Sequence, residues 1–184
     1  ERIQGFAFSP YHSGQDAVAG DFPSIEQIDG DLVLLKDRTR SIRTYTTDST
    51  IGEVPQLAQK HQIKVALGAW IDARFAHNAT EIERAIRLAR RHDNVIRLIV
   101  GNEVILRGDI PLADLTAYLD KVRAAVKQPV STAEPWHVWL RHPELAEHVD
   151  YLAVHMLPYW EGIPADASIG YIDSKVAELE QAFP

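Results

Sequence analysis

The sequence predicts an α/β fold of the (β/α)8 TIM-barrel type, here an incomplete barrel of about six β/α units. Six short β-prone segments alternate with segments in which apolar residues recur at helical spacing, which is typical of βαβ units and a parallel sheet. The loop after the first strand has only Gly14 and Gly20, whereas a doubly wound nucleotide-binding fold would need a glycine-rich turn there. The length of 184 residues falls short of the roughly 250 of a complete barrel. We therefore expect residues 1–184 to form one partial barrel domain.

The predicted elements follow in regular order. Strands are expected over residues 5–9, 41–45, 64–70, 94–100, 129–134 and 149–155, and helices around residues 25–35, 54–58, 82–89, 112–126 and 169–179, with one more after the fifth strand. Ser24 with Gln27 predicts a capping box at the first helix. Thr80 with Glu83 predicts another at the third, in preference to a glycosylation site at Asn78.

Composition excludes several functional classes. The net charge of -7 argues against a nucleic-acid or anionic-membrane partner and favours a neutral ligand over a phosphorylated one. The chain has no cysteine, which excludes disulfides, thiol nucleophiles and zinc–thiolate sites. Its histidines follow no metal-ligand spacing and no lysine stands at a strand end to form a Schiff base, so we expect no metal and no cofactor. No apolar run is long enough to span a membrane.

Reactive groups are expected at the carboxyl ends of the strands, where parallel α/β proteins place them. The apolar residues 97–100 lead into Gly101-Asn102-Glu103, which offers an amide beside a carboxyl able to exchange a proton. The other candidate ligand-binding residues at strand ends are Tyr11, Arg43, Tyr45, Trp70, Glu134, Trp136, Tyr159 and Trp160. Flat rings beside amides and carboxylates suit a sugar-binding cleft, because sugar C–H faces stack while hydroxyls form hydrogen bonds.

Plainer interpretations remain open for some of these residues. Glu103 could simply cap the loop that follows it, and Arg43 could be a buried ion-pair partner. Trp139 could pack in the rim of the barrel, and His155 is interpreted as a satisfied core histidine rather than a proton carrier.

Four elements in order make the sequence resemble bacterial catalytic domains of glycoside hydrolase family 17. They are residues 5–11 (GFAFSPY), 43–48 (RTYTTD), 101–103 (GNE) and 159–160 (YW). The resemblance covers essentially the whole chain, and although many barrel glycosidases share an Asn-Glu at the fourth strand, the four elements together are specific. The family contains endo-β-1,3-glucanases and glucanosyltransferases that work by retention on a β/α barrel.

The resemblance implies roles for individual residues. Glu103 would be the general acid/base, and Asn102 would hold the 2-hydroxyl of the sugar under attack. Arg43 and Tyr45 would line the floor of the cleft, with Arg43 near the nucleophile, and Tyr159 would contact sugar or nucleophile. The substrate would be a β-glucan oligo- or polysaccharide.

One departure from the family pattern concerns the nucleophile. In the family it is a Glu at the end of the seventh strand, in a Gly-Glu-x-Gly-Trp-like motif that residues 1–184 do not contain, so we expect it beyond the C-terminus of this chain. Glu134 adjoins Glu103 on the ring instead of facing it, and is interpreted as a substrate or supporting contact. The chain alone is therefore expected to be inactive, and to self-associate or to dock the missing barrel segment.

Two matters stay open from the sequence. A catalytically silent carbohydrate-binding barrel is the alternative function, and hydrolysis cannot be separated from transglycosylation because both pass through a glycosyl-enzyme. The resemblance also implies an extracytoplasmic, periplasmic location and a membrane-anchored parent protein.

Overall fold

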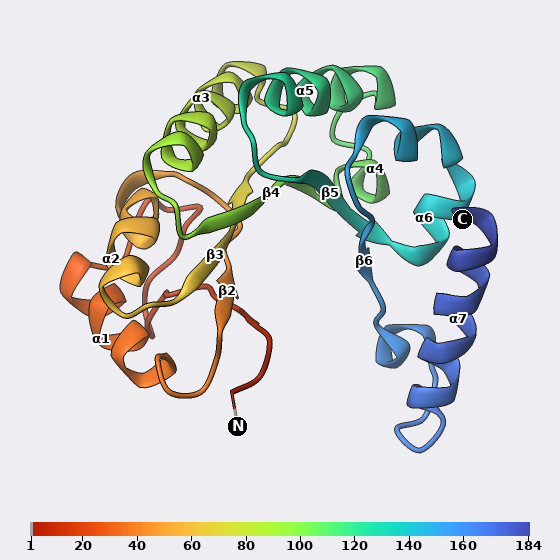
Figure 1. Ribbon diagram of the computed structural model, residues 1–184, viewed down its shortest axis with the longest axis horizontal. Coiled ribbons are helices and arrows are strands. Elements are labelled where there is room, and N and C mark those ends of the chain that lie inside the picture. Colours follow the sequence, from red (N-terminus) through yellow and green to blue (C-terminus); the bar gives the residue numbers. More distant parts are fainter. Residues whose placement is uncertain (1) are drawn as a thin grey trace.

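A computed structural model describes residues 2–184. Its six strands form one parallel sheet in chain order. The strands are β1 (Phe6–Ala7), β2 (Ser41–Arg43), β3 (Lys64–Ala69), β4 (Val95–Asn102), β5 (Val130–Pro135) and β6 (Ala153–His155). Figure 1 shows the sheet curved into an arc with the helices on its convex side. This confirms the incomplete TIM-barrel-type fold that the alternating pattern predicts.

Helices connect the strands and cover the outside of the arc. The α-helices are α1 (Ile25–Leu35), α2 (Val54–Lys60), α3 (Phe75–Arg91), α4 (Val104–Arg107), α5 (Leu112–Ala125), α6 (Trp136–Arg141) and α7 (Ser168–Ala182). Short 3₁₀ helices are η1 (Ser49–Glu53), η2 (Pro143–His148) and η3 (Pro158–Glu161). No helix within residues 2–184 combines the length and the apolar character needed to cross a membrane.

The core lies between the sheet and this helical layer. Leu67, Leu98 and Val130 of the central strands are fully or almost fully buried, as are Ile82 of α3 and Leu119 of α5. Their burial explains the apolar residues of the central strands that face outward, since a parallel sheet in a barrel is covered on its outer face by helices. Trp139 of α6 belongs to this layer, because it is 0% exposed and its indole N–H donates to the Ala153 carbonyl.

Two helix starts test the capping predictions. The Ser24 capping box is confirmed: Ser24 Oγ accepts from the Gln27 amide, and Gln27 Oε1 accepts from the Ser24 amide. The Thr80 capping box is wrong, because α3 begins five residues earlier at Phe75 and the Thr80 hydroxyl donates to the Ala76 carbonyl inside the helix. Asn78 is fully buried and bonds both backbone groups of Asp72, so it fixes the β3–α3 connection.

The two ends of the arc are open. Within residues 2–184, β1 pairs only with β2, and β6 pairs only with β5. Apolar side chains are exposed on the helices that follow these edge strands, including Leu34 on α1 and Ile169 on α7, each 70% exposed. Unpaired edges and exposed apolar residues at both ends are what an incomplete barrel leaves.

Candidate active site

The Gly101-Asn102-Glu103 turn ends β4 at the carboxyl edge of the sheet. Gly101 has φ 86°, and a Cβ built there would lie 2.5 Å from Cγ2 of the buried Val104, so the turn requires glycine. Glu103 also has a positive φ, 56°, in the left-handed region, which is uncommon for a residue with a side chain and frequent at functional sites.

Contacts from β5 hold Glu103 in this conformation. The Glu103 amide donates to the Ala133 carbonyl at 2.7 Å. Glu134, 0% exposed, accepts from the Ile105 and Leu106 amides at the start of α4 at 2.8 and 3.3 Å. Burial raises the pKa of the Glu134 carboxyl, while these two amide donors oppose the shift. Glu134 therefore supports the backbone beside Glu103, and with no exposed surface it has no direct path to a sugar.

A hydrogen-bonded row links three strands around Glu103. Arg43 at the end of β2 donates from Nη2 to Asn102 Oδ1 at 2.8 Å, and its Nη1 lies 3.0 Å from His155 Nε2. His155, at the end of β6, places Nδ1 2.6 Å from Glu103 Oε1. Glu103 remains accessible, with 25% of its side chain exposed. The row joins residues that lie up to 112 positions apart in the sequence.

The Arg43 guanidinium is the charged centre of this row. Burial lowers its pKa, while the nearby Tyr45, Tyr151 and Glu103 oppose the shift. Its Cζ lies 4.7 Å from the centroid of the Tyr45 ring, within the range of a cation–π contact. A guanidinium stays protonated in proteins and only donates hydrogen bonds. Each neighbour that is hydrogen-bonded to Arg43 must therefore present an acceptor atom to it.

Arg107 fixes the opposite side of the turn. Its guanidinium donates to the backbone carbonyls of Asn102 and Ile71 and to Asp109, and it lies 4.7 Å from the Trp70 ring centroid. The Trp70 indole N–H donates to Asp72 at 3.0 Å. Trp70 is therefore anchored beside the β4 turn, with one face covered by a cation.

A hollow of about 340 Å³ opens beside Glu103. Its lining residues come from α4, β5, α6, β6, η3 and the residues directly before α4 and η3: Glu103, Leu106, Pro135, His137, His155, Leu157, Trp160 and Glu161. Trp160 is 79% exposed and stands edge-on to Tyr159, with ring centroids 5.6 Å apart. The hollow thus combines an accessible ring, apolar side chains and two carboxyls.

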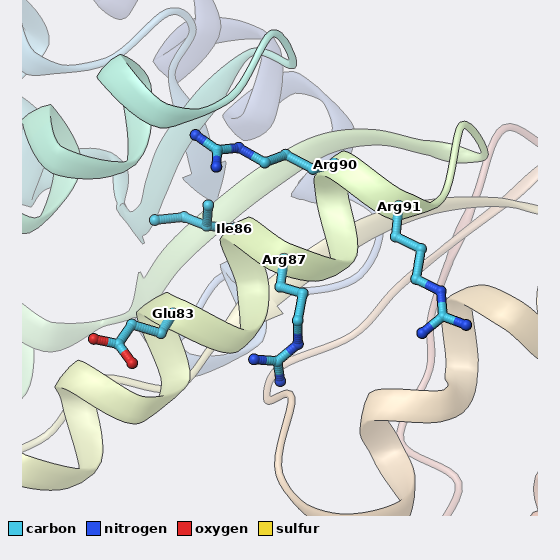
Figure 2. Close-up of a pocket in the computed structure, with 5 residues that line it drawn as sticks. All are labelled: Glu83, Ile86, Arg87, Arg90 and Arg91. Carbon is cyan, nitrogen blue, oxygen red and sulfur yellow. The ribbon is translucent and has the colours of Figure 1, made fainter.

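A second hollow lies on the outside of the molecule. It measures about 390 Å³ and is lined by Glu83, Ile86, Arg87, Arg90 and Arg91 of α3 (Figure 2). These residues belong to the second half of α3, which returns the chain to the amino end of β4. Catalytic groups in β/α barrels lie at the opposite, carboxyl ends of the strands, so the hollow beside Glu103 is the candidate active site.

The structure brings some of the sequence-predicted residues together and leaves others apart. Asn102, Glu103, Arg43 and Tyr45 form one cluster, with Trp160 across the adjoining hollow. Trp136 is held by two other contacts: Lys175 Nζ lies 4.0 Å from its ring centroid, and its N–H donates to Glu161. Tyr11 packs on Phe22 at the β1 end, where burial raises its pKa.

Three site residues were missed by sequence reasoning. His155 was interpreted as a core histidine, yet it bridges Arg43 and Glu103. His137, which follows the fifth strand, was not among the candidate ligand-binding residues, and Arg107 was not considered for the site. Their common signal is position: His137 lies three residues after the predicted end of the fifth strand, His155 lies at the end of the sixth, and Arg107 lies in the short helix α4 that follows the fourth.

Comparison with known sequences gives a consistent picture. The model of the BtgE/BtgC glycoside hydrolase domain matches residues 5–184. The Glucan 1,3-beta-glucosidase of Schizosaccharomyces pombe is 30% identical over 166 residues, 82% of this chain and 51% of that protein. The Probable family 17 glucosidase SCW4 of Saccharomyces cerevisiae is 26% identical over 164 residues, 86% of this chain and 41% of that protein. The chain thus spans about half or less of the length of these relatives.

Comparison with solved structures agrees. The glycoside hydrolase family 17 beta-1,3-glucanosyltransferase from Rhizomucor miehei superposes with a TM-score of 0.82 at 26% identity, covering 98% of this chain and 66% of that one. An active-site mutant of the same enzyme in complex with laminaritriose matches with the same values.

Proposed function

Because the chain belongs to the family of BtgE/BtgC glycoside hydrolase domains, we propose that it carries the acid/base half of a retaining, β-1,3-glucan-active site. The observation that carries the proposal is the position of Glu103: an accessible carboxyl at the carboxyl end of β4, beside Asn102 and at the mouth of a hollow with an exposed tryptophan. The β-glucan substrate is supported by the printed names of the relatives and by the laminaritriose bound to the Rhizomucor miehei mutant.

In this proposal Glu103 is the general acid and then the general base. It protonates the glycosidic oxygen as the bond to the anomeric carbon breaks, while a carboxylate on the other side of that carbon forms the glycosyl-enzyme. As a carboxylate it then takes a proton from water or from a sugar hydroxyl that releases the product. Water leads to hydrolysis and a sugar hydroxyl leads to transglycosylation.

Asn102 is proposed to hold the 2-hydroxyl of the sugar under attack. Its Oδ1 already accepts from Arg43, so the amide is oriented with its NH₂ group free to donate. A donor at this hydroxyl strengthens its contact as the transition state forms. Arg43 and Tyr45 form the floor beneath it.

The hollow beside Glu103 is proposed as the subsite for the leaving or acceptor sugar. A general acid faces the leaving group, and Glu103 itself lines the hollow. Trp160 offers the ring face, Tyr159 extends the aromatic surface, and His137 and Glu161 offer polar contacts. Three further rings are proposed to contribute to the same cleft, but only through the ring edges that neighbouring side chains do not cover: Trp70, Trp136 and Tyr11.

The nucleophile is proposed to come from a further β/α unit that pairs with an open sheet edge. A retaining pair of carboxyls lies about 5–5.5 Å apart across the scissile bond. Within residues 2–184, the other carboxyl at a neighbouring strand end is Glu134, which is buried and committed to α4 amides. This supports residues 1–184 as a partial domain whose catalysis needs the completed ring.

An extracytoplasmic site of action is part of the proposal. One relative is a Cell surface mannoprotein, MP65 of Candida albicans, 23% identical over 164 residues. A polymeric glucan substrate fits that setting, and the periplasm is the specific compartment that we propose.

The test is the Glu103→Gln variant of the full-length protein. Gln keeps the shape and an acceptor for His155 but cannot give up a proton, so turnover of β-1,3-glucan should fall by about 10²–10⁴-fold. Binding of laminari-oligosaccharides, measured by calorimetry, should change little. More than a tenth of the wild-type rate would assign the acid elsewhere, and binding without turnover in the wild type would favour a carbohydrate-binding role.

A further inference from the structure

His155 has contacts on both ring nitrogens, and these contacts determine its state. Nε2 lies 3.0 Å from Nη1 of Arg43 and Nδ1 lies 2.6 Å from Oε1 of Glu103. Arg43 has only donors, so Nε2 must accept and carries no proton. A neutral imidazole then bears its proton on Nδ1. The contact with Glu103 is therefore an Nδ1–H donor on a carboxyl oxygen.

This arrangement makes the two oxygens of Glu103 inequivalent. Oε1 is occupied by the imidazole N–H, whereas within residues 2–184 no hydrogen bond reaches Oε2. An oxygen that accepts a hydrogen bond is a poor place for the acidic proton. The proton that Glu103 exchanges with substrate therefore belongs on Oε2.

We propose that His155 is a positioning residue for Glu103: Arg43 fixes it as the Nδ1–H tautomer, and its hydrogen bond holds Oε1 and leaves Oε2 to exchange the proton. The inference rests on the proposed acid/base role of Glu103. In the first step the Oε2 proton passes to the glycosidic oxygen, and in the second Oε2 receives the proton of water or of an acceptor hydroxyl. His155 keeps its own proton throughout.

The same guanidinium orients the second polar group of the site. Arg43 Nη2 occupies Asn102 Oδ1, so one cation aligns the amide on one side and the imidazole on the other. Its side chain is packed against Tyr45 and its charge is partly desolvated, which limits its movement. Glu103, placed by a strained backbone, thereby gains a fixed side-chain orientation as well.

Two substitutions of His155 distinguish the roles of its two ring nitrogens. The amide nitrogen of Asn superposes on imidazole Nδ1, so His155→Asn keeps a donor for Glu103. The amide of Gln reaches the position of Nε2, so His155→Gln can face Arg43 but offers Glu103 nothing at Nδ1. On unactivated β-1,3-glucan, His155→Gln should lower kcat by about 10–10²-fold with little change in KM, as misplacement of a catalytic group does. His155→Asn should stay closer to the wild type.

An activated substrate separates positioning from loss of fold. A nitrophenyl leaving group departs without a proton, so His155→Gln should form the glycosyl-enzyme from a nitrophenyl glucoside at nearly the wild-type rate. His148→Asn, a surface histidine bonded to Asp120, serves as the control and should behave as the wild type on both substrates. Equal losses in the Asn and Gln variants, or equal losses on both substrates, would overturn the positioning role.

Nitrogen-15 NMR of the full-length protein tests the tautomer without any activity. The His155 signals should show a protonated Nδ1 and an unprotonated Nε2, and the reverse pattern would overturn the inference. A wild type that turns over no β-1,3-glucan while showing the expected tautomer would reject the proposed function and leave this geometric part standing.

Discussion

Gly101→Ala is the substitution for which the structure gives the sharpest energetic expectation. Gly101 has φ 86°, and an added Cβ would lie 2.5 Å from Val104 Cγ2. Val104 is 0% exposed, so it has little room to move away. Gly108, at the other end of α4, has φ 67° and nothing within 4 Å of its Cβ position. Gly108→Ala is therefore a matched control that carries backbone strain without the clash.

The two variants should differ by the cost of the clash. A left-handed conformation costs a residue with a Cβ about 1–2 kcal/mol, which applies to both. Overpacking a buried site adds about 1–3 kcal/mol, which applies to Gly101→Ala alone. We expect losses of about 2–5 kcal/mol for Gly101→Ala and about 1–2 kcal/mol for Gly108→Ala.

Urea denaturation followed by circular dichroism measures both losses. Thermal unfolding gives a second measure. A loss of 1 kcal/mol lowers the melting temperature of a chain of this size by about 2–4 °C, so that of Gly101→Ala should fall by about 4–20 °C. Equal losses in the two variants would refute the packing at Val104. Gly101→Ala should also lower turnover of β-1,3-glucan more than Gly108→Ala, because Val104 follows Glu103 directly.

Two further predictions concern the subsite and the buried carboxyl. Trp160→Ala should weaken laminari-oligosaccharide binding by about 0.5–1.5 kcal/mol on the scale of aromatic contacts. Trp136→Ala should weaken it by less, because Lys175 covers one face of the Trp136 ring. If calorimetry shows the larger loss for Trp136→Ala, the sugar subsite lies at Trp136 instead of Trp160. Burial raises the pKa of Glu134 above its usual 4.5, so the folded state binds that proton more tightly than the unfolded state, and the stability linked to this proton is lost as pH rises through the raised value. The free energy of unfolding of the wild type should therefore fall relative to Glu134→Gln as pH rises from 4.5 towards neutrality, and a pH-independent difference in denaturation curves would contradict this.

The fold could be predicted because its signals are local and repeat along the chain. Apolar strands that alternate with helical spacing fix a parallel sheet, and a parallel sheet fixes which ends carry chemistry. That rule places Asn102 and Glu103, at the end of the longest apolar strand, among the candidate residues. The Ser24 capping box was equally readable, since both of its partners lie within four residues.

The side-chain contacts of the site could not be predicted in the same way. The sequence around a strand-end histidine is the same whether its side chain packs in the core or bridges Arg43 and Glu103. The two partners of His155 lie 112 and 52 residues away, so no local pattern reveals them. The same holds for Glu134, whose burial depends on α4 folding over it. The capping box predicted at Thr80 was wrong because the same residue pattern occurs inside helices as well as at their starts.

The open sheet edges lead to a prediction about residues 1–184 prepared without further β/α units. In the part of the chain that the structure describes, β1 and β6 each pair on one side only, and Leu34 and Ile169 are exposed on the helices that follow them. Unpaired edges and apolar surface favour association with another strand or another chain. We expect this polypeptide to self-associate in solution, as measured by light scattering after gel filtration, and to leave β-1,3-glucan intact.

A double variant separates the two causes of association. Leu34→Lys with Ile169→Lys places charge on the exposed helix faces and leaves the sheet edges unchanged. If the helix faces drive association, the variant should shift towards monomer; if the edges do, it should associate as before. A stable monomer of the unmodified polypeptide that turns over β-1,3-glucan would contradict both expectations, because it would mean that six strands make a closed site and that a carboxyl within residues 1–184 serves as the nucleophile.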